Sequence, residues 1–270
     1  MTLFSALTAA RQKIDRLDAR LLLQYATGCN HADLLARPET PVSAPAFVQF
    51  AEWVERRAAG EPLAYLVGEA EFRGRVFQVS PAVLIPRPET EVLIDLALTK
   101  LQDMTAPKIL DLGAGSGIIA ISLALESPAA TLLAVDLSTA AISVARTNAG
   151  RLGARVDFRH SDWFTHLAGE RFDLIVSNPP YVAADDPHLA GDGLPFEPQM
   201  ALSDGADGLV CIRRIVADAG EHLNPGGWLL FEHGHDQGMA SRNLLTRAGF
   251  KAASTHPDLA GIDRVSGGHL

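Results

Sequence analysis

Cysteine, positive charge and long apolar runs are all scarce in this sequence. Among its 270 residues there are two cysteines, Cys29 and Cys211, whose separation predicts neither a disulfide framework nor a metal site. No apolar run approaches the ~18 residues that a membrane-spanning helix needs, so no membrane partner is expected. The N-terminus lacks the basic start, apolar block and small-residue cleavage site of a secretory signal. These absences predict a cytoplasmic protein without a bound metal.

The balance of charge weighs against a protein that binds nucleic acid. Lys and Arg total 23 against 32 Asp and Glu, which gives a formal net charge of −9. Contact with phosphates needs clusters of basic residues, and the sequence contains no long run of Lys and Arg. Hydrophobic residues make up 47% of the chain and charged residues 20%, as in ordinary globular proteins. From the charge balance we expect no direct contact with nucleic acid. A chain of 270 residues is longer than a usual single-core domain, so we expect about two domains.

The first quarter of the chain has the periodicity of α-helices. Leucine, isoleucine and alanine recur at three- and four-residue steps through residues 3–21. Ser43 is a candidate N-cap for a further helix, which Gly60 would end. We therefore predict a small helical domain over residues 1–65, with a role left open between binding a partner and stabilising the fold. The helical period then ends, and residues 66–86 are predicted to form a β-hairpin linker.

From residue 87 to residue 270 the sequence alternates between strand and helix. Apolar runs such as KILDL, TLLAVD and FDLIVS are typical of buried parallel strands, and amphipathic segments lie between them. This alternation predicts an α/β domain in which helices cover both faces of a parallel sheet. Residues 182–208 interrupt it with a long stretch rich in Gly, Pro and Asp. Loops of that length in compact domains are usually functional or disordered, and we expect a lid or a substrate-binding wall.

A glycine-rich turn joins the first strand of this domain to the next helix. Glycines let the backbone turn tightly and let a ligand approach main-chain N–H groups, and a helix N-terminus attracts an anion. Asp136, which ends the next strand, can accept both ribose hydroxyls of a nucleoside or can simply cap a helix. Together they indicate an adenosine-type cofactor, NAD or S-adenosylmethionine, and Gly115–Ala120 even satisfy the dinucleotide pattern. The residues of the turn are Gly113, Ala114, Gly115, Ser116 and Gly117.

Three further residues are expected near the same edge of the sheet. Asp162 and Trp163 follow the third strand, where an acid and an aromatic ring can bind and stack an adenine. The alternative for Trp163 is a half-buried structural role. Asp111, just before the glycines, either takes the ammonium of the cofactor or braces the turn.

The segment SNPPYV closes the fourth strand with a stiff corner. Pro179 and Pro180 fix their φ angles near −65°, remove two donors and keep Asn178 out of the helical region. A planar –NH2 group offers two hydrogens, which the Asn178 side-chain oxygen and the Pro179 carbonyl can accept while Tyr181 covers the flat face. A nitrogen held in this way lies in line with an electrophilic methyl, so orientation supplies much of the catalysis. The corner favours methyl transfer over hydride transfer, because hydride transfer has no use for such a clamp. The alternative is that the two prolines form only a rigid turn where the chain leaves the strand.

In this order and spacing, DLGAGSG, VD and NPPY resemble the class I S-adenosylmethionine-dependent methyltransferases that modify planar amines. Within that class the chain is similar to the release-factor glutamine N5-methyltransferases. The resemblance covers nearly the whole chain and implies a Rossmann-like, mostly parallel sheet of seven strands beside the helical N-terminal domain. The stretches that carry it are GEAEFRG (68–74), VLIPRPETE (83–91) and FEPQMALSDGADGL (196–209).

The resemblance implies a reaction and a set of site residues. A methyl group would pass from S-adenosyl-L-methionine, leaving S-adenosyl-L-homocysteine, to the glutamine N5 in the Gly-Gly-Gln motif of class I peptide chain release factors. The helical domain would bind the release factor, although no docking residue can be carried over, and Arg87 and Glu197 would shape the pocket. The cofactor would contact Gly113, Ala114, Gly115, Ser116, Gly117, Asp136, Trp163 and Asn178. The glutamine would be held by the catalytic candidates Asn178, Pro179, Pro180 and Tyr181.

Other functions stay open at this stage. Adenine-N6 methylation of nucleic acid would need base flipping and a phosphate-binding surface, which the charge of −9 disfavours. A sister family methylates glutamine in a ribosomal protein, but its members typically have a different sequence where this chain has PRPETE, so the resemblance disfavours that substrate. A nucleoside-binding module or a dehydrogenase is the third class. We expect a monomer; the preferred release factors, the domain angle and any lid movement are not predicted.

Overall fold

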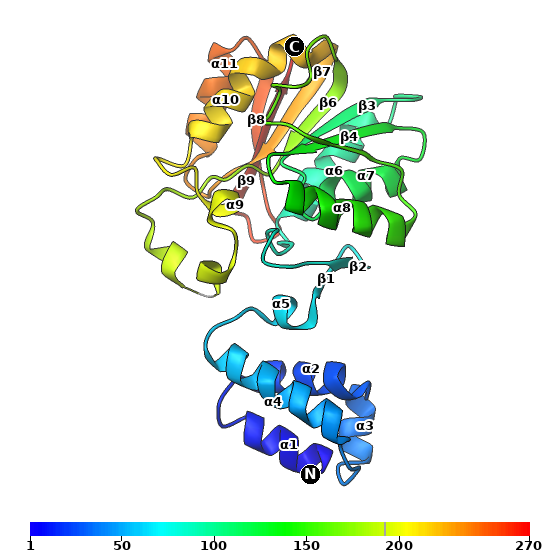
Figure 1. The fold of residues 1–270 in the computed structure, drawn as a ribbon. Helices are drawn as coiled ribbons and strands as arrows, with labels where there is room; N and C mark the ends of the chain where they lie inside the picture. The colour runs from blue at the N-terminus through cyan, green and yellow to red at the C-terminus, as the bar shows by residue number, and fades with distance from the viewer. Residues whose placement is uncertain (192) are drawn as a thin grey trace. The chain divides into compact units, whose positions relative to one another are not determined.

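The computed structural model describes residues 1–191 and 193–270 and divides into two compact units (Figure 1). Unit 1 comprises Met1–Glu69 together with Ala190–Phe196. Unit 2 comprises Ala70–Leu189 together with Glu197–Leu270. Each unit is therefore built from two stretches of chain, an arrangement that the sequence pattern does not indicate.

Unit 1 is helical, as its apolar periodicity predicts. Ser43 is the N-cap of α4, where its hydroxyl accepts the N–H of Ala46. The core of the unit forms around α2, whose Leu22 and Leu23 are fully buried. The helices are α1 Leu3–Ala10, α2 Arg16–Thr27, α3 His31–Ala36, α4 Ala44–Ala58 and α5 Leu63–Val67, with a short 3₁₀ turn at Leu194–Phe196.

A two-stranded hairpin follows, made of β1 (Glu69–Phe72) and β2 (Arg75–Gln78). Arg73 and Gly74 form its turn with φ of 50° and 69°, the left-handed pair that a two-residue hairpin loop requires. The Arg73 guanidinium forms ion pairs with Asp95 and Glu126 in unit 2. The turn is thus held against the body of that unit.

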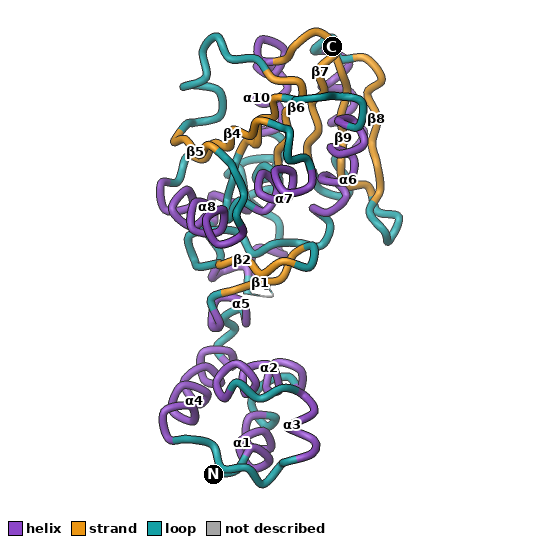
Figure 2. Tube along the Cα trace, turned by 90° about the vertical axis from the view of Figure 1, so that its right-hand side faces the viewer, coloured by secondary structure: helices purple, strands orange, loops and turns teal. Residues whose placement is uncertain are grey.

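Unit 2 is a sheet covered by helices on both faces (Figure 2). In the described part of the chain the sheet has seven strands in the order β5-β4-β3-β6-β7-β9-β8. The first five are parallel, and β9 runs antiparallel to both of its neighbours, which confirms the mostly parallel sheet expected from the resemblance. The strands are β3 Lys108–Leu112, β4 Thr131–Asp136, β5 Asp157–His160, β6 Phe172–Ser177, β7 Leu223–Glu232, β8 Lys251–Pro257 and β9 Asp263–His269.

Alternate residues of the strands enter two separate cores. In β3, Ile109 packs with helices α6, α7 and α8 on one face, whereas Leu110 packs with α10 and α11 on the other. None of the helices in the described residues is long and apolar enough to cross a membrane. The helices of unit 2 are α6 Thr90–Leu101, α7 Ile118–Glu126, α8 Thr139–Leu152, α9 Gln199–Leu202, α10 Val210–Ala219 and α11 Gly238–Arg247, with 3₁₀ turns at Pro187–Ala190 and Gly220–His222.

The strand order reverses at β3, which pairs with β4 on one side and β6 on the other. In open α/β sheets, ligands bind outside the carboxyl ends of the strands at such a switch point. The glycine turn follows β3, Asp136 ends β4 and Asn178 follows β6. The topology therefore brings the three sequence motifs to one edge of the sheet.

Candidate active site

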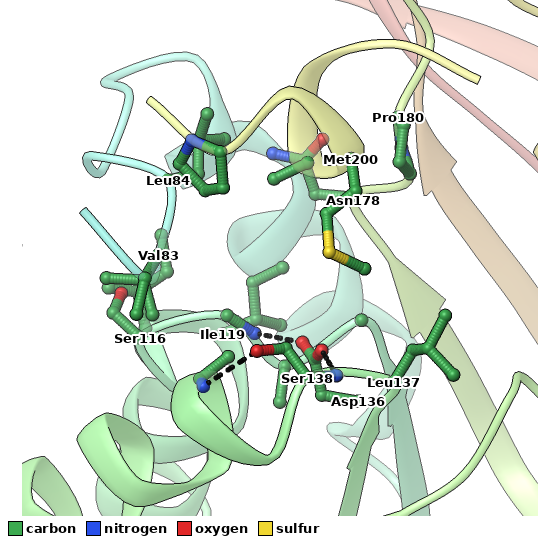
Figure 3. Close-up of a pocket in the computed structure, with 18 of the residues that line it drawn as sticks. Val83, Leu84, Ser116, Ile119, Asp136, Leu137, Ser138, Asn178, Pro180 and Met200 are labelled. Carbon is green, nitrogen blue, oxygen red and sulfur yellow. Dashed lines mark hydrogen bonds between the residues drawn. The ribbon is translucent and has the colours of Figure 1, made fainter. Parts of the chain in front are cut away.

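A cavity of about 300 Å³ lies at this switch point, large enough for a small ligand (Figure 3). In Figure 3, Asn178 and Met200 lie across the cavity from Asp136 and Ser138. Gly117, Pro179 and Tyr181 are not among the lining residues. The candidate residues that line it are Arg87, Gly113, Ala114, Gly115, Ser116, Asp136, Asp162, Trp163, Asn178 and Pro180.

The glycine turn is bonded along its length to the end of β4. The N–H groups of Gly113 and Ala114 donate to the Val135 carbonyl, each at 2.9 Å, and the Gly115 N–H donates to Asp136 Oδ2 at 2.8 Å. Gly117 does something different, because a Cβ there would lie 2.7 Å from Ile121 Cδ1. Its φ of 87° and its missing side chain let α7 begin in close contact with its neighbours.

Asp136 points into the cavity edge with both oxygens engaged. Oδ2 accepts the Gly115 N–H, and Oδ1 accepts the Ser138 N–H at 2.7 Å. Burial raises the pKa of this carboxyl, while the backbone bonds oppose the rise. Each oxygen keeps a lone pair for a further donor. Ser138, whose hydroxyl accepts the Ala141 N–H, is the N-cap of α8, so Asp136 is not that cap.

Asp111 and Trp163 occupy contrasting environments. Asp111 is fully buried, and its Oδ2 accepts the Ala120 N–H at 3.1 Å, so it braces the start of α7. Burial raises the pKa of its carboxyl to about 7, with the Ala120 N–H opposing. Trp163 lines the cavity with a left-handed φ of 49°, a conformation that costs free energy in a bulky residue. Asp162 pairs with Arg214 of α10 at 2.9 Å.

The Asn-Pro-Pro-Tyr corner is held by side chains from two elements, α6 and β7. Asn178 Nδ2 donates to the hydroxyl of Thr90 at 3.2 Å, and Thr90 Oγ1 donates to Glu232 Oε2 at 2.8 Å. The Tyr181 hydroxyl donates to the other oxygen, Glu232 Oε1, at 2.9 Å. Burial raises the pKa of both the Glu232 carboxyl and the Tyr181 phenol. Neither Thr90 nor Glu232 is singled out by the sequence motifs, although a glutamate that closes the apolar run WLLFE is a usable signal.

The corner is also supported from behind, at the main chain of Tyr181. Gln237 Nε2 donates to the Tyr181 carbonyl at 2.9 Å and to the Gly208 carbonyl at 3.2 Å. Gly208 has a φ of 78°, and a Cβ built on it would lie 2.4 Å from the Tyr181 oxygen. Only a glycine lets residue 208 approach the corner this closely.

Gly208→Ala is expected to move the corner, whereas Gly205→Ala is not. Both glycines have similar positive φ, 78° and 75°, so both variants carry the same backbone strain. Within the described residues a Cβ on Gly205 meets nothing inside 4 Å. We expect Gly208→Ala to lose about 1–3 kcal/mol more unfolding free energy than Gly205→Ala, the usual effect of overpacking. Urea unfolding of both variants measures the difference, and equal losses would contradict the proposed contact.

A second carboxylate joins two walls of the cavity. Glu197 Oε2 accepts the Ile85 N–H at 3.0 Å, and Oε1 pairs with the Arg87 guanidinium. The Glu197 side chain is 1% exposed. Residues 82–87 and 198–204 both contribute to the lining, so part of the long segment 182–208 is a wall of the cavity.

Comparisons with known proteins place this geometry in a family. Residues 90–190 match the Methyltransferase small domain and residues 2–68 match the PrmC N-terminal domain. The chain is 50% identical over 258 residues to the release factor glutamine methyltransferase of Bordetella pertussis, covering 95% of this chain and 96% of that protein. The chain belongs to the release factor glutamine methyltransferase family. The protein of the same name from Burkholderia pseudomallei is 48% identical over 264 residues, covering 95% of this chain and 93% of that protein.

Solved structures support the fold of this release factor glutamine methyltransferase family member. The hMettl16 catalytic domain superposes with a TM-score of 0.58 at 15% identity, over 84% of this chain and 82% of that one. The T. thermophilus 16S rRNA N2 G1207 methyltransferase RsmC, solved with AdoMet and guanosine, gives 0.55 at 23% identity, over 74% of this chain and 49% of that one. At these identities the likeness establishes the class I methyltransferase fold alone.

Proposed function

We propose that this chain transfers a methyl group from S-adenosyl-L-methionine to the side-chain amide of a glutamine in peptide chain release factors. The observation that carries the proposal is the position of Asn178, at the rim of a cavity lined by the glycine turn and Asp136. Relatives that bear the release factor glutamine methyltransferase name are similar over nearly the whole chain, which supports the substrate class. We place the target glutamine in the Gly-Gly-Gln motif of class I release factors, as the resemblance implies.

The residues of the cavity fit the cofactor. Asp136 is a partly buried carboxylate whose oxygens each keep an acceptor site, so the two ribose hydroxyls match it. The turn from Gly113 to Ser116 lines the cavity and leaves room beside Gly115, where a Cβ would meet no described atom within 4 Å. Trp163 lines the same cavity and supplies an aromatic face. We assign these groups, with Gly117 as the residue that sets the turn against α7, to the cofactor site.

The bound cofactor supplies a methyl group made electrophilic by the sulfonium centre. The protein then has to present one nitrogen lone pair to it, and we assign that task to the corner. Asn178 Oδ1 and the Pro179 carbonyl accept the two hydrogens of the glutamine –NH2, the two prolines hold the acceptors rigid, and Tyr181 limits the position of the amide plane. Fixed orientation of this kind replaces an otherwise improbable encounter.

Proton removal is not assigned to Tyr181. Its hydroxyl donates to Glu232, and burial beside that carboxyl raises the pKa of the phenol, so it stays protonated at neutral pH. The proton of the methylated amide leaves after transfer, toward solvent. Alignment by Asn178 and Pro179, rather than a general base, is therefore the proposed source of rate.

Unit 1, where residues 2–68 match the PrmC N-terminal domain, is assigned to binding the release factor, as the family resemblance implies. A substrate that acts on ribosomes implies a cytoplasmic location for this enzyme. We expect a monomer, which sedimentation or light scattering can test.

A labelling experiment tests the function. The purified protein is incubated with methyl-tritiated S-adenosyl-L-methionine and, separately, a release factor, the same factor with its Gly-Gly-Gln glutamine replaced by alanine, and duplex DNA. Label is expected in the intact release factor only. Label that is indifferent to the glutamine, or that enters DNA, would overturn the proposal.

A further inference from the structure

We propose that Thr90 and Glu232 are positioning residues that decide which atom of the Asn178 carboxamide faces the substrate. This inference rests on the function proposed above and concerns two residues outside the corner, of which Thr90 lines the cavity. Thr90 opens helix α6, Asn178 follows strand β6 and Glu232 ends strand β7. Ser177 pairs with Phe231 in the sheet, so the next residues, Asn178 and Glu232, leave neighbouring strands side by side.

The direction of the hydrogen bonds follows from the chemistry of the groups. The Thr90 hydroxyl has one hydrogen, which it donates to Glu232 Oε2 at 2.8 Å. The Thr90 oxygen can then only accept from Asn178, which lies 3.2 Å away. The Asn178 –NH2 group is thereby drawn toward Thr90. Its Oδ1 is left on the other side, as the acceptor that the proposed reaction requires.

Tyr181 holds Glu232 in place through the second oxygen of that carboxylate. Its hydroxyl occupies Glu232 Oε1 at 2.9 Å, so both oxygens of the buried carboxylate are bonded to hydroxyl donors. Glu232 and Thr90 are each 0% exposed, and water therefore does not compete for these groups. One carboxylate sets the polarity of Asn178 through Thr90 and anchors the Tyr181 ring directly.

The opposite orientation of Asn178 would be unproductive. It would present –NH2 to the two N–H groups of the incoming glutamine amide, donor against donor. Loss of the Thr90 hydroxyl removes the group that prevents this reversal. We therefore expect the defect to lie in turnover, with little change in binding of the cofactor, because the cofactor is assigned to Asp136 and the glycine turn rather than to Thr90 or Glu232.

Thr90→Val keeps the shape of the side chain and removes the hydroxyl. We expect kcat with the release factor to fall about 10- to 100-fold, as expected when a reacting group is misoriented, with KM and the Kd of S-adenosyl-L-methionine within about threefold. Thr90→Ser restores the hydroxyl and is expected to return kcat to within about fivefold of wild type. The matched control is Thr99→Val on the same helix, where the threonine is exposed and its hydroxyl donates to the Asp95 carbonyl.

Glu232→Gln gives an independent reading in a side chain of the same shape. Glutamine offers one acceptor oxygen and one –NH2, so Thr90 and Tyr181 cannot both donate to it, and kcat is expected to fall more than about tenfold. The inference is overturned if Thr90→Val and Glu232→Gln both retain kcat within threefold of wild type, or if Thr90→Ser is as impaired as Thr90→Val. Either result leaves the proposed function standing, whereas absence of release factor labelling by the wild-type protein refutes that function instead.

Discussion

Asn178→Ala is expected to lower kcat for release factor methylation by about 10²–10³-fold, comparable to losing one preorganised group aimed at a reacting atom. The variant removes the side-chain acceptor that we assign to the glutamine –NH2 and leaves the backbone of the corner in place. Asp136 and the glycine turn are untouched, so the Kd of S-adenosyl-L-methionine should stay within roughly tenfold. Single-turnover kinetics and calorimetric titration measure the two effects separately.

The matched control for this variant is Asn243→Ala, which makes the same truncation at an exposed position of α11. It should leave both kcat and the Kd unchanged within twofold, as expected of a surface substitution away from the site. An unchanged kcat in Asn178→Ala would contradict the role assigned to the corner.

Asp136→Ala is expected to weaken binding of S-adenosyl-L-methionine by about 10²–10⁴-fold. The estimate takes two charge-assisted hydrogen bonds to ribose hydroxyls at ~1.5–3 kcal/mol each. The same change frees the N–H groups of Gly115 and Ser138, so the Tm should fall as well. Asparagine is no substitute, because its –NH2 would face one of these two donors.

The control for the second variant is Asp157→Ala. Asp157 is an exposed acid at the start of β5, where it pairs with Arg159. It should change the Kd by less than about twofold, as surface ion pairs contribute little. A Kd that is unchanged in Asp136→Ala, measured by calorimetry on folded protein, would remove its ribose role.

The sequence predicts those parts of the site that lie in short, local motifs. The glycine turn, Asp136 and the Asn-Pro-Pro-Tyr corner each follow an apolar strand, and carboxyl ends of parallel strands meet at one edge of the sheet. Their convergence on one cavity could therefore be predicted before any coordinates. The helical N-terminal region was predictable for the same reason, because its apolar period is local.

The parts that the sequence does not predict depend on distance in the chain. Thr90 and Glu232 are 142 residues apart. The periodicities of helices and strands are local, so they do not predict that the start of α6 lies beside the end of β7. Asp162 illustrates the same limit, since its pairing with Arg214 depends on where α10 packs. Gly117 matches the glycine pattern, yet its contact is with Ile121 rather than with the cavity.

The boundary between Phe196 and Glu197 has a mechanical consequence. Phe196 is the last residue counted with unit 1, and Glu197, joined to it by one peptide bond, is the carboxylate that ties Ile85 and Arg87 to the cavity wall. Any displacement of the main chain at Glu197 would therefore act directly on Ile85 and Arg87, so two walls of the cavity are coupled through one buried carboxylate.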